Sequence, residues 1–173
     1  ITDYSKMLKD EASLSREKMK TLSLIELIND VTEEFSNNKS FIEKNISFEI
    51  VKEKPNGHSL NVFGARSRLQ QVLANLIDNA ISFSPKNSSI YIGIKGNNDT
   101  VQIIIKDEGP GFKEKDTERV FKRFYSNRPE KFGEHSGLGL NIVKNLVELH
   151  NGQIHASNNK DKGAKIEITF PKV

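Results

Sequence analysis

The sequence predicts a two-layer α/β sandwich of several helices and about five or six strands. Segments with apolar residues at three- and four-residue steps, typical of amphipathic helices, are interspersed along the 173 residues with short stretches of alternating apolar and polar residues, typical of strands. Two of these strands flank a turn rich in glycine and asparagine, which indicates a hairpin. No internal repeat is visible, so we expect one domain with a modest N-terminal appendage.

The composition argues against several classes of protein. Hydrophobic residues make up 35% of the chain and charged residues 28%, as in a polar globular domain. The net charge is only +3 and the lysines are scattered among acids, which gives little support to a nucleic-acid partner. Cysteine is absent, so disulfides and thiolate metal sites are excluded. No apolar run approaches the roughly 20 residues that a membrane helix needs.

The first part of the chain predicts two helices and two strands. A charged helix with a narrow apolar stripe is expected over residues 1–11. The capping-box signature Ser23-Leu-Ile-Glu26 opens a second helix. The alternating residues 45–51 and the short apolar stretch 60–63 are expected to be strands, and residues 55–57 are expected to form a turn between them.

The longest helix is predicted over residues 69–85. Its apolar residues recur at helical spacing and form one buried stripe: Leu69, Val72, Leu73, Leu76, Ala80 and Phe83. Asn75 and Asn79 are four residues apart, so they stack on a neighbouring face of this helix. Two amides at the border of an apolar stripe need hydrogen-bond partners, because a buried amide without them costs roughly 1–3 kcal/mol. Taken alone, they are either ordinary surface or capping residues or ligands of a bound group.

The second part of the chain alternates strands with one helix. The predicted strands are 90–95, 100–106, 153–157 and 165–170, and the helix is 138–150. Residues 96–99 read as the hairpin turn between the first two strands. Residues 112–136 form a polar connection with one short helical pattern, and a connection of that length in a compact domain is usually functional or disordered.

Two glycine-rich stretches are the strongest candidates for binding chemistry. Asp107-Glu-Gly-Pro-Gly111 ends a strand, and a carboxylate there can accept a hydrogen bond from an adenine amino group, although an ordinary turn has the same pattern. Ser136-Gly-Leu-Gly-Leu140 leads directly into a helix, whose free N–H groups and positive dipole end suit phosphate oxygens. The lysine of a Walker phosphate loop is missing after these glycines. Between the two stretches, Phe121-Lys-Arg-Phe-Tyr125 and Arg128 combine aromatic and basic residues, a pattern that also occurs in proteins that bind single-stranded nucleic acid.

The asparagine helix and the two glycine-rich stretches, in this order, resemble the ATP-binding domain of two-component sensor histidine kinases. This domain belongs to the superfamily that includes DNA gyrase, the Hsp90 chaperones and MutL. The resemblance covers about residues 22–171, and its details are most similar to the ChvG-type kinases of alphaproteobacteria. It implies a Bergerat-type fold, a mixed sheet of about five strands covered on one face by about three helices. It also implies a division into the stub of a dimerisation helix over 1–20 and a catalytic ATP-binding domain over 21–173, with a lid at about 112–136.

The resemblance also implies roles for individual residues. Asp107 would read adenine, with Gly109 and Gly111 as the hinge of its loop, and Phe83 would pack near the base. Asn79 would coordinate Mg²⁺. Asn75 stands where gyrase and Hsp90 carry a glutamate that activates water, so we expect slow ATP hydrolysis and a phosphoryl group kept for a protein acceptor.

The remaining implied roles belong to the second glycine stretch and the lid. The phosphates of ATP would be bound by Ser136, Gly137, Leu138, Gly139 and Leu140. In the lid, Phe121 and Phe124 would be aromatic anchors, and Arg123 and Arg128 would approach the terminal phosphate, with solvated charge as the alternative for both arginines.

The chain departs from the family pattern in three places. Ser82 replaces a basic residue, Glu134-His135 replaces glycines before the second glycine stretch, and Gly163-Ala-Lys-Ile166 replaces a hydroxyl-rich sequence. None of the four histidines stands in the motif of a phospho-acceptor, so the attacking histidine is expected in an upstream segment.

The resemblance implies a wider assembly. The partners would be ATP with Mg²⁺, the upstream dimerisation domain, a response regulator and a second copy of the parent protein. This domain would be cytoplasmic, with the parent anchored in a bacterial inner membrane. An ATP-driven clamp of the gyrase or Hsp90 type and a degenerate nucleotide-binding module that signals by conformation are the alternative functions.

Overall fold

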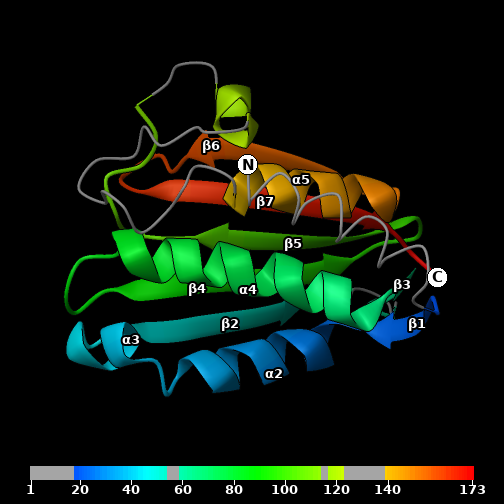
Figure 1. The fold of residues 1–173 in the computed structure, drawn as a ribbon, viewed down its shortest axis with the longest axis horizontal. Coiled ribbons are helices and arrows are strands. Elements are labelled where there is room, and N and C mark those ends of the chain that lie inside the picture. Colours follow the sequence, from blue (N-terminus) through cyan, green and yellow to red (C-terminus); the bar gives the residue numbers. More distant parts are fainter. Residues whose placement is uncertain (1–17, 54–58, 114–116, 123–138) are drawn as a thin grey trace, which may run out of the picture.

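The computed structural model describes residues 18–53, 59–113, 117–122 and 139–173. The centre of the domain is a mixed five-stranded sheet in the order β2-β4-β5-β7-β6 (Figure 1). Its strands are β2 (Ser47–Glu53), β4 (Ser89–Gly96), β5 (Thr100–Lys106), β6 (Gln153–Asn158) and β7 (Ala164–Pro171). Only the β2–β4 pair is parallel among these neighbours, and the predicted hairpin between β4 and β5 is confirmed.

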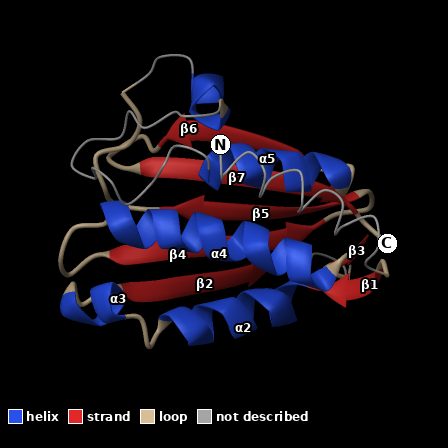
Figure 2. Ribbon diagram, in the orientation of Figure 1, coloured by secondary structure: helices blue, strands red, loops and turns tan. Residues whose placement is uncertain are grey.

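Three helices lie side by side on one face of the sheet (Figure 2). They are α2 (Leu24–Phe35), α4 (Arg66–Phe83) and α5 (Gly139–Leu149). The described residues also contain two short helical elements, α3 (Lys39–Glu43) and the 3₁₀ helix η2 (Thr117–Phe121). The predicted two-layer sandwich with a mixed sheet and about three covering helices is therefore confirmed. In the described ranges, no helix has the length and apolar character required to cross a bilayer.

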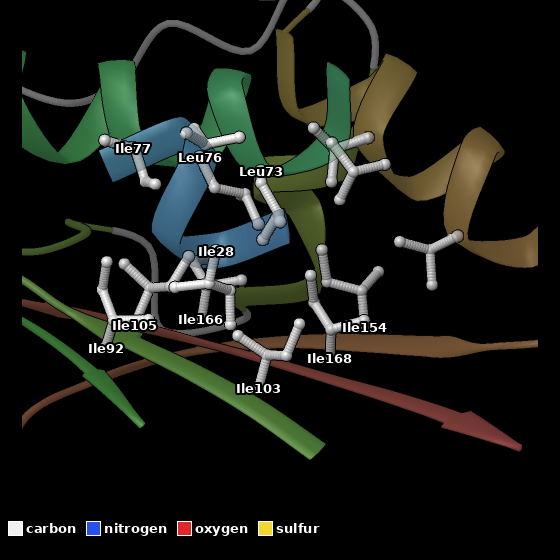
Figure 3. Close-up of a cluster of buried hydrophobic side chains, with 14 of the residues drawn as sticks. Ile28, Leu73, Leu76, Ile77, Ile92, Ile103, Ile105, Ile154, Ile166 and Ile168 are labelled. Carbon is white, nitrogen blue, oxygen red and sulfur yellow. The ribbon is translucent and has the colours of Figure 1, made fainter. Parts of the chain in front are cut away.

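The core lies between the helical layer and the inner face of the sheet (Figure 3). Isoleucines at alternate positions of the strands point toward this layer, among them Ile92, Ile103 and Ile168, each at most 1% exposed. Leu73 and Ile77 of α4 meet them from the other side. Alternation in the strands and helical spacing in α4 thus place both sets of side chains in one dry interior.

Capping interactions fix where the first helices begin. The side chain of Ser23 accepts a hydrogen bond from the backbone N–H of Glu26, as the capping-box signature predicts for α2. Asn38 caps a separate short helix, because its side chain accepts from the N–H of Phe41. Sequence reasoning missed α3, since five residues are too few to show a helical period.

A two-stranded ribbon outside the main sheet was also missed in part. The predicted short strand is present as β3 (Asn61–Gly64), and it pairs with β1 (Lys20–Ser23), which sequence reasoning did not predict. Four residues with only one buried side chain carry too little pattern to indicate a strand. The predicted helix over 1–11 and the turn at 55–57 lie outside the described residues.

A buried histidine holds the start of α4. The N-cap residue Ala65 has no side-chain oxygen to offer, and its own N–H donates to Nε2 of His150 at 3.1 Å. Because Nε2 accepts, the ring proton is on Nδ1, which donates to the carbonyl oxygen of Leu146 at 2.7 Å. The neutral ring therefore joins the last turn of α5 to the first turn of α4.

We expect His150→Phe to lower the free energy of unfolding by about 1–3 kcal/mol, because the buried N–H of Ala65 loses its acceptor. Urea unfolding followed by circular dichroism measures the change. The control is His155→Phe, which removes an exposed pair with Glu118 and should cost less than about 1 kcal/mol. Equal costs for the two variants would contradict a special role for His150.

Candidate functional site

The C-terminal ends of α4 and β5 lie at one end of the molecule, at the left of Figure 1, and the N-terminal end of α5 lies nearer the middle of that view. Strand β5 leads into Asp107, and α5 begins with Gly139. The helix that carries Asn75 and Asn79 is thereby placed beside the loop of the first glycine stretch.

Asp107 is held in place by backbone hydrogen bonds. Its side chain is buried, with 4% of the residue exposed. One carboxylate oxygen, Oδ1, accepts hydrogen bonds from the backbone N–H groups of Gly109 at 2.9 Å and Ala164 at 3.1 Å. Its own N–H donates to the carbonyl oxygen of Ala164 at 3.0 Å, which extends the β5–β7 ladder by one residue. Two charge-assisted bonds therefore fix the orientation of a buried acid.

Two glycines allow the surrounding backbone to close around Asp107. A Cβ atom at Gly109 would lie 2.3 Å from the carbonyl oxygen of Phe83, so the loop packs directly on the end of α4. A Cβ atom at Gly163 would lie 1.9 Å from the carbonyl oxygen of Asp107, and Gly163 also has a φ of +98°. Gly109 therefore needs to be glycine because of the close approach, and Gly163 because of the close approach and the positive φ angle. Gly111, the other predicted hinge residue, has a φ of +78°.

Two asparagines that sequence reasoning did not select hold the loops together. Asn158 forms a reciprocal pair with the backbone of Phe112: its Oδ1 accepts at 2.7 Å and its Nδ2 donates at 3.0 Å. Asn159 donates to the carbonyl oxygen of Asp107 at 3.1 Å. These bonds join segments about 50 residues apart, so a local pattern carries no signal of them beyond two adjacent amides at a strand end.

The two asparagines of α4 differ from these structural amides. Asn75 and Asn79 are both partly buried on the helix. Their side chains make no hydrogen bond with any part of the chain that the structure describes. Partly buried amides that the protein leaves without partners are suited to an external ligand. The capping interpretation is excluded by position, because both lie inside α4.

The described parts of the predicted lid are attached to α5 and β6. In η2, Phe121 is buried and its carbonyl oxygen accepts from Nδ2 of Asn141 at 2.9 Å. Thr117 donates its hydroxyl to the carbonyl oxygen of Ala156, and Glu118 pairs with His155 at 2.7 Å. This end of the segment is therefore anchored by side chains of the sheet and of α5.

Several predicted site residues cannot be assessed from the structure. Arg123, Phe124, Arg128, Ser136, Gly137 and Leu138 lie outside the described residues. Gly139 and Leu140 form the first turn of α5, with Gly139 exposed and Leu140 partly buried against the core. Phe83 is partly buried at the end of α4.

The arrangement favours a polar organic ligand over a protein-only metal centre. Across the described ranges, no cluster of three or more histidine, cysteine, aspartate or glutamate residues is placed to bind a metal ion. A fixed buried carboxylate and a close-packed glycine loop lie at the C-terminal end of α4, and the same helix carries two amides that make no hydrogen bond with the described residues. Such a site suits a ligand with a planar donor edge and an anionic tail.

A family model supports this interpretation of the site. The model for histidine kinase-, DNA gyrase B- and HSP90-like ATPases matches residues 64–173, which include α4, Asp107 and α5. The chain belongs to this ATPase family. The resemblance inferred from the motifs is thereby confirmed.

Curated relatives of this ATPase domain include bacterial sensor proteins. The sensor protein ChvG of Agrobacterium fabrum is 33% identical over 184 residues, which cover 99% of this chain and 30% of the relative. ChvG of Rhizobium meliloti is 34% identical over 182 residues, covering 99% and 31%. The chain thus spans about a third of the length of these relatives.

Solved structures confirm the fold of this ATPase domain. The catalytic domain of histidine kinase ThkA, in a nucleotide-free form, is 29% identical with a TM-score of 0.75, covering 90% of this chain and 98% of that one. The mycobacterial sensor histidine kinase MprB is 26% identical, with the same TM-score and the same coverage. The two-layer arrangement is therefore that of histidine kinase catalytic domains.

We expect Gly163→Ala to destabilise the domain by about 3 kcal/mol or more, because the added carbon meets a backbone oxygen and the φ angle disfavours a side chain. The control is Gly139→Ala, since no heavy atom of the described chain lies within 4 Å of the added carbon and alanine favours a helix. Denaturant unfolding compares the two variants. A Gly163→Ala variant as stable as Gly139→Ala would contradict the close packing at Asp107.

Proposed function

We propose that the chain is the Mg-ATP-binding catalytic domain of a sensor histidine kinase, which transfers the γ-phosphoryl group of ATP to a histidine in a dimerisation domain outside this chain. The observation that carries the proposal is the orientation of Asp107 by two backbone amides in a buried loop. Membership of the ATPase family and the sensor kinases among its relatives support it.

Asp107 is suited to recognise adenine. A carboxylate accepts hydrogen bonds only, and the exocyclic amino group of adenine is a donor. Because Oδ1 is held by Gly109 and Ala164, the carboxyl group has a fixed orientation toward a ligand donor. Phe83, whose backbone adjoins Gly109, supplies an aromatic side chain at the same end of α4. These groups would read the base and pack beside it.

Asn79 is suited to hold Mg²⁺. The ion prefers oxygen ligands and usually binds through a few protein oxygens, water and substrate phosphates. A neutral amide oxygen without a protein partner, in a region that lacks a carboxylate cluster among the described residues, fits a shared site of this kind. Bound there, the ion would neutralise phosphate charge, which is its usual contribution to phosphoryl transfer.

Asn75 favours phosphoryl transfer over an ATP-driven clamp. An amide has no basic site near neutral pH, so it cannot take a proton from an attacking water molecule. It can still accept and donate hydrogen bonds beside the phosphates. We therefore propose that the domain positions ATP for a histidine nucleophile and hydrolyses it slowly.

The second glycine stretch and the lid would complete the phosphate end. Ser136, Gly137, Leu138, Gly139 and Leu140 precede or begin α5, whose N-terminal N–H groups suit anions. We propose Arg123 and Arg128 as the cations that approach the terminal phosphate, with Phe124 as a lid anchor. Their contribution would be charge neutralisation and positioning.

The partners proposed for the whole protein follow from its relatives. The histidine kinase ThkA has been solved in complex with its response regulator TrrA, and that chain is 27% identical over 99% of this one with a TM-score of 0.73. We propose a response regulator as the final acceptor, residues 1–20 as the end of a dimerisation helix, and a homodimeric parent anchored in a bacterial inner membrane. Residues 21–173 would form the catalytic unit in the cytoplasm.

We expect Asn79→Ala to weaken ADP binding about tenfold or more in the presence of Mg²⁺, because an ion ligand is lost. Calorimetric titration with and without Mg²⁺ measures the effect, which should shrink when Mg²⁺ is left out. The matched control is Asn29→Ala, an exposed asparagine of α2, which should bind as the unsubstituted chain does. Unchanged affinity of both Asn79→Ala and Asn79→Asp would show that Asn79 is a structural amide.

We expect the chain alone neither to phosphorylate itself nor to hydrolyse ATP rapidly, since no acceptor histidine is present and Asn75 is not a base. Adding a separate fragment with the upstream dimerisation helices should yield phosphohistidine on that fragment, although weak association will slow it. Transfer of radiolabel from ATP is the measurement, with Asp107→Asn as the control that loses nucleotide recognition. Acid-stable label on the chain itself would overturn the histidine kinase assignment.

A further inference from the structure

Lys44 lies beside the C-terminal end of α4, the helix that carries Asn75 and Asn79. It is the C-cap residue of α3, and its side chain crosses to α4. Its ammonium Nζ donates to the carbonyl oxygens of Ile81 at 2.9 Å and Ser82 at 3.0 Å. The carbonyl oxygen of Ile81 also accepts from the N–H of the C-cap residue Ser84, at 3.3 Å. A cation at this position adds a donor to the last carbonyl groups of the helix and opposes the negative end of the helix dipole.

The backbone around Lys44 is locked to the loop after α4. The carbonyl oxygen of Lys44 accepts from the N–H of Asn87 at 2.7 Å. The next residue, Asn45, donates from Nδ2 to Oδ1 of Asn87 at 2.9 Å. Both asparagines have positive φ angles, 52° and 62°, so the two turns meet in left-handed conformations. The turn that carries the Lys44 ammonium group is therefore bound to the loop after α4 by one backbone and one side-chain hydrogen bond.

The same end of α4 supports the adenine-side loop. Gly109 packs against the carbonyl oxygen of Phe83, one residue beyond the second carbonyl that Lys44 holds. Gly109 in turn donates its N–H to Oδ1 of Asp107. A continuous path therefore runs from the Lys44 ammonium through the last turn of α4 to the carboxylate.

We propose that Lys44 is a positioning residue for the nucleotide site: it holds the last turn of α4 so that Phe83 and the Gly109 loop keep Asp107 in its binding orientation. This inference rests on the proposed function, since the position of Asp107 matters for affinity only if the site binds a nucleotide. Loss of the cation would loosen the last turn of α4 without removing any group that touches the ligand.

The test uses substitutions at Lys44 in the whole chain, with ADP and excess Mg²⁺ as the probe. Lys44→Met keeps the length of the side chain but removes its charge and donors, and Lys44→Arg keeps both. The matched control is Lys39→Met on the same helix, whose ammonium is exposed and pairs only distantly with Glu43, at 4.0 Å. Calorimetry gives the affinity, and urea unfolding confirms that each variant is folded under the conditions of titration.

We expect Lys44→Met to weaken ADP binding about tenfold, equivalent to about 1.4 kcal/mol, and Lys44→Arg to restore binding to within about threefold of the unsubstituted chain. Lys39→Met should leave the affinity unchanged. Rescue by arginine distinguishes positioning through the charged donor from a general effect of altered packing.

Three results would overturn the inference. These are full affinity in Lys44→Met, no rescue by Lys44→Arg, or an equal loss in Lys39→Met. If Lys44→Met does not fold, Lys44→Gln and Lys44→Arg decide the question, since arginine must bind ADP at least about threefold more tightly than glutamine does. Absence of ADP binding by the unsubstituted chain would overturn the proposed function and this inference together. Equal ADP binding by the unsubstituted chain and the Lys44→Met variant would overturn only the inference about Lys44.

Discussion

The arrangement of the site depends on one requirement, that the buried carboxylate of Asp107 be satisfied by backbone. An ionised group with so little exposure is costly unless donors surround it. The donors are the N–H groups of Gly109 and Ala164, which belong to segments 55 residues apart in the sequence. Bringing both to a single oxygen requires β5 and β7 to be adjacent and the loop before β7 to pass close to Asp107. The glycine at 163 follows from this crowding, because a side chain there would meet the backbone of Asp107.

The site is assembled from the ends of regular elements, and polar side chains hold those ends together. His150 joins α5 to the start of α4, and Lys44 joins α3 to the C-terminal end of α4. Asn158 joins β6 to the loop before η2. Between these ends, apolar side chains of the described helices and strands form one buried cluster (Figure 3). Packing thus sets the distance between the layers, while hydrogen bonds at the rim set the direction of the chain as it enters and leaves the site.

The sequence predicted the layers and most of the elements because their patterns are local. The alternation in β4, β5 and β7 and the helical spacing of α4 survive in the structure, and β5 has the bounds expected for it. The five-residue α3 and the four-residue β1 were missed, since so few residues cannot display a period. Asp107 and the helix asparagines were selected from their motifs, and the structure places Asp107 in a buried, fixed orientation. Lys44, Asn158 and Asn159 could not be selected, because their importance comes from contacts with residues 37 to 52 positions away.

The pairing of β1 with β3 places the N-terminal strand beside the start of α4. Lys20, the first residue of β1, pairs with Gly64, which directly precedes the cap of α4. The other end of α4 carries Phe83, against which the Gly109 loop packs. An 18-residue helix is about 27 Å long and resists bending along its axis. The helix therefore connects the β1–β3 pair at one end to the loop that holds Asp107 at the other, so a shift of that strand pair along the helix axis would displace the loop.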